Sequence, residues 1–192
     1  KNDFLEKNKL LIIIKNLISN NYVGKLNFLE VGCSNGSLLL KLKKKVKNCR
    51  IFGVDPSQKA IAELKKKNVK CQVATADDLG FKKKSMDIIY YGFCLYLCDR
   101  EDYRKIYLNA NKVLKKKGYI IIFDFFSKKI KKIVYHHDKR ILSIKQDFRK
   151  IFLKNPRYKC IYHEVFNYYE MFKVNKPKKN DFLSISIIRK KN

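Results

Sequence analysis

Short apolar segments alternate with helical segments along most of this chain, and this order constrains the fold more than any other feature. The apolar runs have the length and composition of strands that are buried on both faces. The segments between them carry apolar side chains at helical spacing. The predicted strands cover residues 26–32, 50–55, 69–75, 86–93, 119–126, 158–172 and 181–190. An alternating order of this kind requires right-handed crossovers and a mostly parallel sheet with helices on both faces.

The end of the chain departs from this alternation. No helical segment separates the last two predicted strands, 158–172 and 181–190, which are joined by a lysine-rich turn. These two strands must therefore pair antiparallel at one edge of the sheet. We predict an α/β, Rossmann-like, doubly wound fold whose seven-stranded sheet ends in an antiparallel C-terminal hairpin. The pattern also predicts a long helix over 101–117, with Gly118 at its C-cap.

The length and composition are those of one domain. A chain of 192 residues with 46% apolar side chains can bury a single hydrophobic core. We divide it into an N-terminal helix within 1–24, a ligand-binding core over 25–126, an insert over 127–157 and the closing strands over 158–192.

The turn after the first strand carries the strongest functional motif. In LNFLEVGCSNGSLLL, a strand ends at Glu30, glycines follow at Gly32 and Gly36, and a helix begins directly afterwards. Glycine is needed where a chain turns tightly beneath a ligand, because a Cβ atom would clash or would forbid the backbone angles. The helix that follows presents free backbone N–H groups to that ligand.

Two carboxylates define the ligand. Asp55 ends the second predicted strand, where an acidic side chain can accept hydrogen bonds from both hydroxyls of a ribose. Glu30 stands where it would repel a pyrophosphate, but where it could hold an ammonium group or an ordered water. No Gly-Lys-Ser/Thr follows the turn, which excludes a Walker phosphate loop. The expected ligand is therefore cationic and carries adenosine.

These residues resemble the class I S-adenosylmethionine-dependent methyltransferases, particularly small bacterial members that act on small molecules. The resemblance covers residues 25–190. Glu30, Gly32 and Gly36 match the first motif of the family, an acid followed by x-Gly-x-Gly-x-Gly, with Ser34 in place of the middle glycine. The segment CQVATADDLGFKKKSMDIIYYGF resembles the third strand, the L-P-F turn and the fourth strand, with Gly80 in place of proline. VLKKKGYIIIFDF resembles the L-K-P-G-G turn and the fifth strand.

The resemblance implies S-adenosylmethionine as cofactor. Where many members have an acid that holds the adenine amine, this chain has Thr75, and either its hydroxyl or Asp77 would serve instead. The implied cofactor-binding residues are Glu30, Gly32, Ser34, Gly36, Asp55, Pro56, Thr75, Ala76, Asp77 and Tyr91.

The acceptor is expected over the carboxyl ends of strands 86–93 and 119–126, beneath the insert. Methyl transfer needs in-line positioning and, for weakly acidic nucleophiles, a general base. The catalytic candidates are Asp124, His136 and His137. Alternatively, Asp124 caps a backbone segment or forms a salt bridge, and the two histidines are solvated without a catalytic role. The candidate substrate residues are Phe93, Tyr96, Tyr135 and Lys145. The aromatic residues Tyr91, Phe93 and Tyr96 suit a pocket wall or core better than a specific ligand contact. No carboxylates stand at metal-ligand spacing, so no metal is expected.

The predicted reaction is methyl transfer to an oxygen or nitrogen atom of a small molecule, such as a saccharide or a nucleotide-linked metabolite. A net charge of +28 favours a nucleic-acid methyltransferase as the alternative. Against it, Lys outnumbers Arg several-fold, as AT-rich codon usage would produce. YYGF stands after the fourth strand, where exocyclic-amine methyltransferases have Asn/Asp-Pro-Pro-aromatic, and the Pro-Cys of cytosine methylation is absent. A non-catalytic cofactor-binding protein is the third possibility.

Cysteine usage and hydropathy predict a cytoplasmic protein. The six cysteines include no C-x-x-C pair and lie mostly within apolar runs, as free thiols do in a reducing compartment. The apolar run at 10–18 is interrupted by Lys15, is too short to span a bilayer, and has no small-residue cleavage site after it. A small-molecule partner and no membrane are expected, and the oligomeric state is left open.

Overall fold

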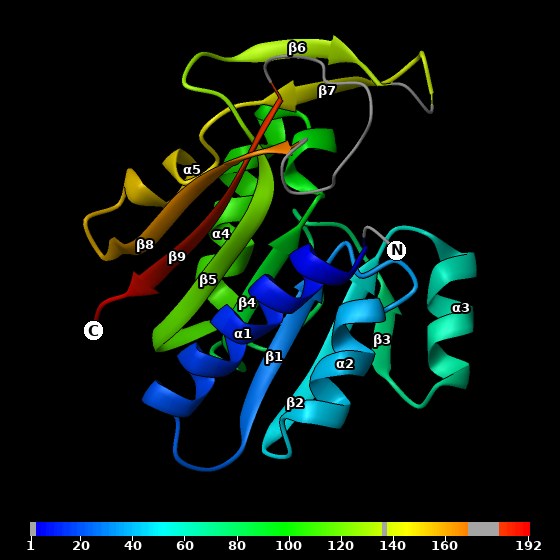
Figure 1. Ribbon diagram of the computed structural model, residues 1–192, viewed down its shortest axis with the longest axis vertical. Helices are drawn as coiled ribbons and strands as arrows, with labels where there is room; N and C mark the ends of the chain where they lie inside the picture. The colour runs from blue at the N-terminus through cyan, green and yellow to red at the C-terminus, as the bar shows by residue number, and fades with distance from the viewer. Residues whose placement is uncertain (1–2, 136–137, 169–180) are drawn as a thin grey trace.

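The computed structural model describes residues 3–135, 138–168 and 181–192 (Figure 1). In chain order the elements are α1 (Asp3–Asn21), β1 (Leu26–Val31), α2 (Ser37–Lys45), β2 (Cys49–Asp55), α3 (Gln58–Lys66), β3 (Lys70–Val73), β4 (Met86–Gly92), the 3-10 helices η1 (Leu95–Leu97) and η2 (Arg100–Asp102), α4 (Tyr103–Val113), β5 (Leu114–Phe126), β6 (Lys131–Val134), β7 (Leu142–Lys145), α5 (Lys150–Leu153), β8 (Tyr158–Asn167) and β9 (Phe182–Lys190). None of the described helices is both long and apolar enough to cross a membrane.

Seven strands form one sheet in the order β3-β2-β1-β4-β5-β9-β8. The strands from β3 to β5 are parallel, whereas β9 is antiparallel to β5 and β8 is antiparallel to β9. The predicted doubly wound sheet and its antiparallel C-terminal edge are therefore confirmed. The strand order reverses between β1 and β4, where ligands of open α/β sheets bind beyond the carboxyl ends of the strands.

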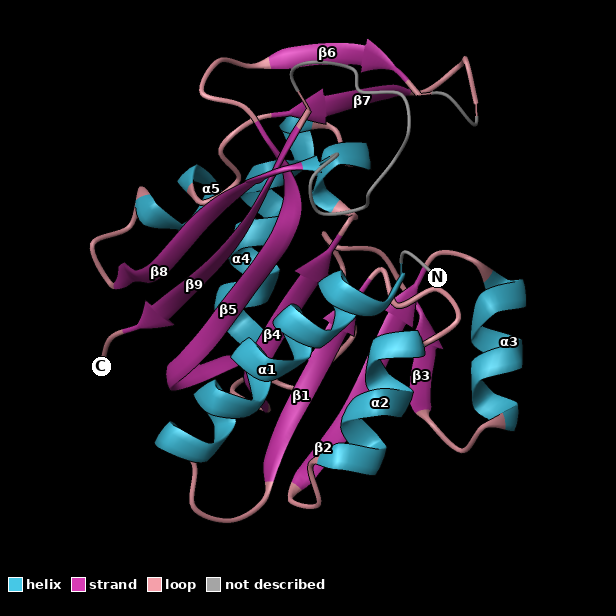
Figure 2. Ribbon diagram, viewed as in Figure 1, coloured by secondary structure: helices cyan, strands magenta, loops and turns pink. Residues whose placement is uncertain are grey.

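The sheet separates two apolar cores, because successive side chains of a strand point to opposite faces. In Figures 1 and 2, α1 and α2 lie in front of the sheet and α4 lies behind it. Phe28 and Ile88 pack with the core of α1, α2 and α3, and the next residues, Leu29 and Ile89, pack with the core of α4 and α5. All four side chains are fully buried.

The predicted helix over 101–117 is wrong at its C-terminal end. Helix α4 ends at Val113, and β5 begins with Leu114, which is fully buried and pairs with Met86. Gly118 lies within β5, not at a helix C-cap, and a Cβ there would stand 2.9 Å from the Asp87 carbonyl oxygen. The pairing with β4 and burial of Leu114 therefore outweigh the helical propensity of the three lysines that follow it.

The insert contains elements that the sequence did not predict. Strands β6 and β7 form a separate antiparallel hairpin, and α5 adds a short helix after it. Figure 1 shows this hairpin at the top of the molecule, beyond the carboxyl end of β5. The Ser143 hydroxyl donates to the Ile133 carbonyl oxygen at 2.9 Å, and Ser143 and Ile144 are buried.

Candidate active site

The turn between β1 and α2 is held against the end of β2. The amides of Gly32 and Cys33 both donate to the Val54 carbonyl oxygen, at 2.9 and 3.0 Å. The Ser34 amide donates to Asp55 Oδ2 at 2.8 Å. These bonds hold the first motif next to the acid at the end of the second strand.

The glycines of this turn are required by the protein itself. Gly32 and Gly36 have φ of 74° and 69°, which favour glycine. A Cβ on Gly32 would lie 2.7 Å from Cys94 Cβ, and one on Gly36 would lie 2.3 Å from Leu64 Cδ1. A Cβ atom at either position would therefore clash with a neighbouring element of the protein itself.

Ser34, which replaces the family's middle glycine, also has a left-handed backbone, with φ of 44°. Its hydrogen bond to Asp55 offsets part of the cost of this conformation. Its side chain is exposed at the turn.

Asp55 links three segments through its carboxylate. Oδ2 accepts from Ser34, and Oδ1 accepts from the Ser57 amide at 2.9 Å, at the N-terminus of α3. The residue is 9% exposed, and Pro56 beside it is exposed. Each carboxylate oxygen has two acceptor sites, so one site on each oxygen remains for ribose hydroxyls.

Glu30 is the electrostatically unusual group of the site. Its side chain is buried, and its Oε2 atom has no hydrogen-bond partner among the described residues. Burial raises the pKa of Glu30 to about 8, a hydrogen bond from the Leu39 backbone opposes this rise, and the charge of Asp55 adds to it. A buried acceptor of this kind is suited to a cationic ligand, which would supply the missing partner.

The segment after β3 completes the edge of the site. The Ala74 amide donates to the Asp55 carbonyl oxygen at 3.2 Å, which places Thr75 next to the end of β2. Thr75 is exposed, Ala76 is buried, and Asp77 is half-buried, with its carbonyl oxygen accepting from Asn109 Nδ2.

Gly80 occupies the place of the family's proline for a clear reason. Its φ is 67°, which proline cannot adopt, and a Cβ there would lie 2.4 Å from Gln72 Nε2. The Gln72 side chain in turn donates to the Leu79 carbonyl oxygen at 2.9 Å. The departure from the family pattern is therefore accommodated by a different turn.

The structure places the Tyr91 ring away from the glycine turn. Tyr91 is fully buried in the core of α4 and α5, with its ring centroid 5.9 Å from that of Phe152. Its hydroxyl has no hydrogen-bond partner among the described residues. Tyr91 is a predicted cofactor residue that also suited a pocket wall or core, and its ring faces this core.

The four candidate substrate residues lie around one ring that the sequence analysis did not select, Phe125. Phe125 stands 5.7 Å from Phe93 and 5.0 Å from Tyr96, between ring centroids. Tyr135 packs edge-on to Tyr96 at 6.1 Å. The Lys145 ammonium lies 4.4 Å from the Phe125 centroid. Phe125 lies one residue before the end of β5, and this position is the sequence signal that could have identified it.

Two further residues close this aromatic cluster. Lys145 is buried and its ammonium forms an ion pair with Asp181 at 2.6 Å. Tyr168 stacks on Phe125 with a centroid distance of 5.8 Å. The sequence gives no signal for Tyr168 or Asp181, because Tyr168 follows β8 and Asp181 precedes β9, both far along the chain from Phe125.

Asp124 is sealed within the protein. It is 0% exposed, Oδ1 accepts from the Phe125 amide at 2.8 Å, and Oδ2 accepts from the Leu95 amide at 2.9 Å. Burial raises the pKa of Asp124 to about 7, and these backbone hydrogen bonds oppose the rise. This is the geometry of a group that holds η1 in place, as the capping alternative predicted.

The two candidate histidines, His136 and His137, lie outside the described residues. The third histidine, His163, lies on β8 with Nδ1 2.9 Å from the Ser186 hydroxyl oxygen, and burial lowers its pKa. No group of three or more histidine, cysteine or acidic side chains suited to a metal ion is found among the described residues.

The two carboxylates lie at the switch point of an α/β sheet, and comparison with known proteins bears on the class of the domain. Residues 28–118 match the family model described as "Methyltransferase domain". This match indicates a class I S-adenosylmethionine-dependent methyltransferase domain in this part of the chain, with S-adenosylmethionine as the methyl donor. No curated protein sequence matches the chain.

Solved structures with this fold act on different acceptors. The chain is similar to the 1,6-didemethyltoxoflavin-N1-methyltransferase of Burkholderia thailandensis, with TM-score 0.74, 15% identity, and coverage of 99% of this chain and 80% of that one. It is also similar to the geranyl diphosphate C-methyltransferase of Streptomyces coelicolor A3(2), with TM-score 0.71, 12% identity, and coverage of 94% and 77%. A methyltransferase of Mesorhizobium loti matches with TM-score 0.70, 13% identity, and coverage of 99% and 100%. At these identities the likeness shows the fold alone.

Proposed function

We propose that this enzyme methylates an oxygen or nitrogen atom of a small molecule, such as a saccharide or a nucleotide-linked metabolite. The observation that carries the proposal is the cluster of Phe93, Tyr96, Phe125 and Tyr135 at the carboxyl ends of β4 and β5, beside the donor site. Aromatic faces of this kind stack on planar rings, including nucleobases. The ion pair of buried Lys145 with half-buried Asp181 gives the same cluster one polar edge.

The donor is proposed to lie between the two carboxylates. The bound cofactor supplies an electrophilic methyl group on a positively charged sulfur. Asp55 would accept the ribose hydroxyls, and Glu30 would ionise against the positive charge of the ligand. The unpartnered Oε2 of Glu30 supports this assignment, because a buried acceptor without a donor is costly until a ligand provides one.

The remaining cofactor residues are proposed from their places around these carboxylates. Backbone groups of Gly32, Ser34 and Gly36 would line the turn beneath the donor, and Pro56 would border the ribose. Thr75 or Asp77 would hold the adenine amine, next to Ala76. Tyr91 would contribute through its backbone, because its ring lies in the opposite core.

We assign the base to the insert and a positioning role to Asp124. Asp124 is sealed and hydrogen-bonded to backbone amides, so it would fix η1 and through it Tyr96, not exchange protons with the acceptor. His136 and His137 are the remaining candidates for the base. His136→Ala and His137→Ala are expected to slow turnover without changing cofactor affinity, and full activity in both variants would remove the assignment.

The decisive experiment combines binding with turnover. S-adenosylhomocysteine titrated into the protein should release heat and raise the melting temperature. Labelled methyl donor, incubated with the protein and a metabolite extract of the source cell, should label a small compound. Phe125→Ala should abolish labelling more than it weakens S-adenosylhomocysteine binding, with the exposed Phe182→Ala as a matched control. Label that appears only in macromolecules would contradict the proposal.

Nucleic acid is the alternative acceptor, and the net charge of +28 favours it. A charge of this size attracts any polyanion at low salt, so the test must be made at about 150 mM salt, where counterion release weakens non-specific binding. Binding of tRNA, rRNA or duplex DNA that survives there, together with methylation of that polymer, would replace the small-molecule proposal.

A further inference from the structure

A cavity of about 660 Å³ lies on the α4 side of the sheet, and none of its lining residues belongs to the proposed donor site. Its walls come from η2 and α4, from the segment after β5, and from the segment between β7 and β8 that includes α5. Five of its lining residues are cationic: Arg100, Arg104, Lys128, Lys150 and Lys154.

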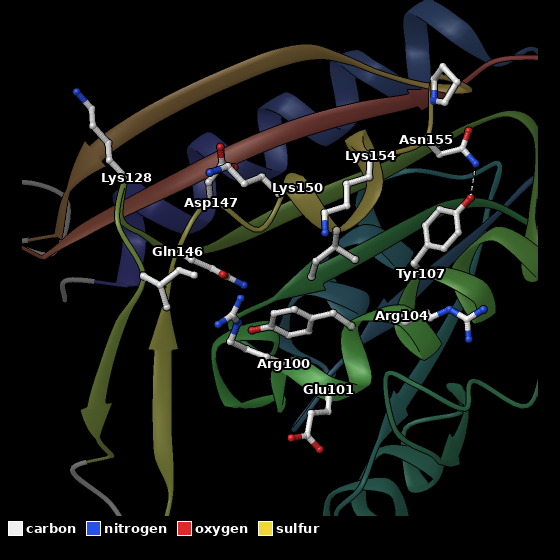
Figure 3. A pocket seen from close by; sticks show the side chains of 14 residues that line it. Arg100, Glu101, Arg104, Tyr107, Lys128, Gln146, Asp147, Lys150, Lys154 and Asn155 are labelled. Atoms are coloured by element: carbon white, nitrogen blue, oxygen red, sulfur yellow. Dashed lines mark hydrogen bonds between the residues drawn. The ribbon is translucent and has the colours of Figure 1, made fainter.

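These cations have no internal counterion among the described residues. Only two acidic residues line the cavity, Glu101 and Asp147. Asp147 is already occupied, because its two carboxylate oxygens accept from Arg149 Nε and Nη2, both at 2.8 Å. Figure 3 shows the Glu101 carboxylate pointing away from the cavity. The cavity therefore has an uncompensated positive charge.

The placement of the charges separates this cavity from the generally basic surface. In Figure 3, Lys154 extends into the space from α5, whereas Arg100 approaches it from the opposite side, next to Gln146. Solvated lysines spread apart because like charges repel. Cations that approach one hollow from opposite walls are instead suited to an anion held between them.

The neutral groups of the cavity add hydrogen-bond donors. The Tyr107 hydroxyl accepts from Asn155 Nδ2 at 2.6 Å, so its own proton remains to be donated (Figure 3). A guanidinium, ammonium groups and a hydroxyl donor match the several acceptor oxygens of a phosphate group. The cavity volume is within the range of small-molecule sites.

We propose that this cavity binds the phosphate groups of a phosphorylated small molecule, with Arg100 and Lys154 as its main contacts. The inference stands on the charges and walls of the cavity and does not depend on which acceptor is methylated. A small ligand is favoured over a nucleic acid because the cations converge on one hollow of limited volume, whereas a polymer backbone requires a row of contacts.

The test is calorimetric titration of inorganic pyrophosphate and of ADP into the protein at about 150 mM salt. The double variant Arg100→Glu with Lys154→Glu should weaken both probes by more than about tenfold, since it removes two charge-assisted contacts. Lys82→Glu with Lys159→Glu is the matched control, because it changes the net charge equally at two exposed lysines outside the cavity. The control should stay within about twofold of the original affinity.

Three results would overturn the proposal: no binding of either probe, equal weakening in the control, or tight binding of single-stranded RNA alone that is lost in the cavity variant. If the charge reversals prevent folding, Arg100→Gln with Lys154→Gln gives the same comparison.

S-adenosylhomocysteine titrated into each variant separates the phosphate-binding proposal from the methyltransferase assignment, because the cavity variants should retain the full effect of this ligand on melting temperature. Absence of that effect in the original protein would contradict the methyltransferase assignment and leave the cavity result unaffected.

Discussion

The turn after β1 and the loop after β4 use the same structural device on neighbouring strands. In each, an aspartate at the end of the next strand accepts a hydrogen bond from the loop backbone: Asp55 of β2 from Ser34, and Asp124 of β5 from Leu95. Each loop also contains a non-glycine residue with a left-handed backbone, Ser34 with φ of 44° and Phe93 with φ of 50°.

The two aspartates differ in what else they can reach. Both oxygens of each aspartate accept from backbone amides, but Asp124 is 0% exposed, whereas Asp55 is 9% exposed at the carboxyl end of β2. The same residue type therefore fixes a loop in one place and remains accessible to a ligand in the other. The degree of burial, not the residue type, separates the two aspartates.

The largest expected effect is on stability, at Asp124. Asp124→Ala leaves the buried amides of Leu95 and Phe125 without an acceptor, which should lower the free energy of unfolding by about 3 kcal/mol. Urea denaturation measures this loss. Asp78→Ala, at an exposed position, is the control and should change stability by less than about 0.5 kcal/mol. An unchanged midpoint in Asp124→Ala would mean that Asp124 does not hold η1.

Substitution of Asp55 should mainly weaken the binding of S-adenosylmethionine. Asp55→Ala should weaken S-adenosylmethionine binding by roughly 1.5–3 kcal/mol, about 10- to 150-fold in Kd, through a lost charge-assisted hydrogen bond. Calorimetry measures the affinity of Asp55→Ala for S-adenosylmethionine, and Asp78→Ala, at an exposed acidic residue, is the control. Equal affinity in the Asp55 variant would show that the ribose lies elsewhere, and the contrast with Asp124 would disappear.

The contribution of Glu30 to stability and to ligand affinity should depend on pH, with a sign that follows from its raised pKa. Its pKa in the folded protein is raised from 4.5 to about 8, so its ionisation opposes folding increasingly as pH rises through this interval. Glu30→Gln should therefore raise the melting temperature at pH 7 in the absence of ligand. The same variant should bind S-adenosylmethionine roughly tenfold more weakly at pH 8, because the ionised carboxylate is lost.

The difference in affinity between the original protein and the Glu30→Gln variant should shrink as pH falls from about 8 to 6, because the native carboxyl group then binds a proton that the ligand must displace. Comparison of the two proteins at each pH cancels titration of the ligand itself. A difference that is constant with pH would contradict the assignment of Glu30 to the cationic ligand.

The smallest effect is expected at Ser34. Ser34→Gly relieves a left-handed backbone but increases the freedom of the unfolded chain, and the two contributions of about 1 kcal/mol each nearly cancel. The variant should remain within about 0.5 kcal/mol in stability, by urea denaturation, and within about twofold in S-adenosylhomocysteine affinity. A large loss of affinity would assign the Ser34 side chain a direct contact.

The fold and the proximity of the glycine turn to Asp55 were predictable because they depend on local patterns. Strands buried on both faces are continuous apolar runs, and the glycine turn with Asp55 follows from its place at their ends. The error at 101–117 arose because three lysines favour a helix locally, whereas pairing of Leu114 with Met86 decides the strand. The sequence offered Tyr91 both as a cofactor residue and as a pocket-wall or core residue, and alternation along β4 directs its ring into the core of α4 and α5.

The sequence by itself determined the order of strands and helices, the antiparallel end of the sheet, and the pair of carboxylates at the switch point. Only the tertiary structure decided that Asp124 is sealed, that Phe125 is the centre of the aromatic cluster, and that Arg100 and Lys154 face one cavity. The reason is physical: periodicity and turn chemistry act between residues that are close in the chain. Burial, pKa and convergence of charge depend on side chains that the fold brings together from distant segments.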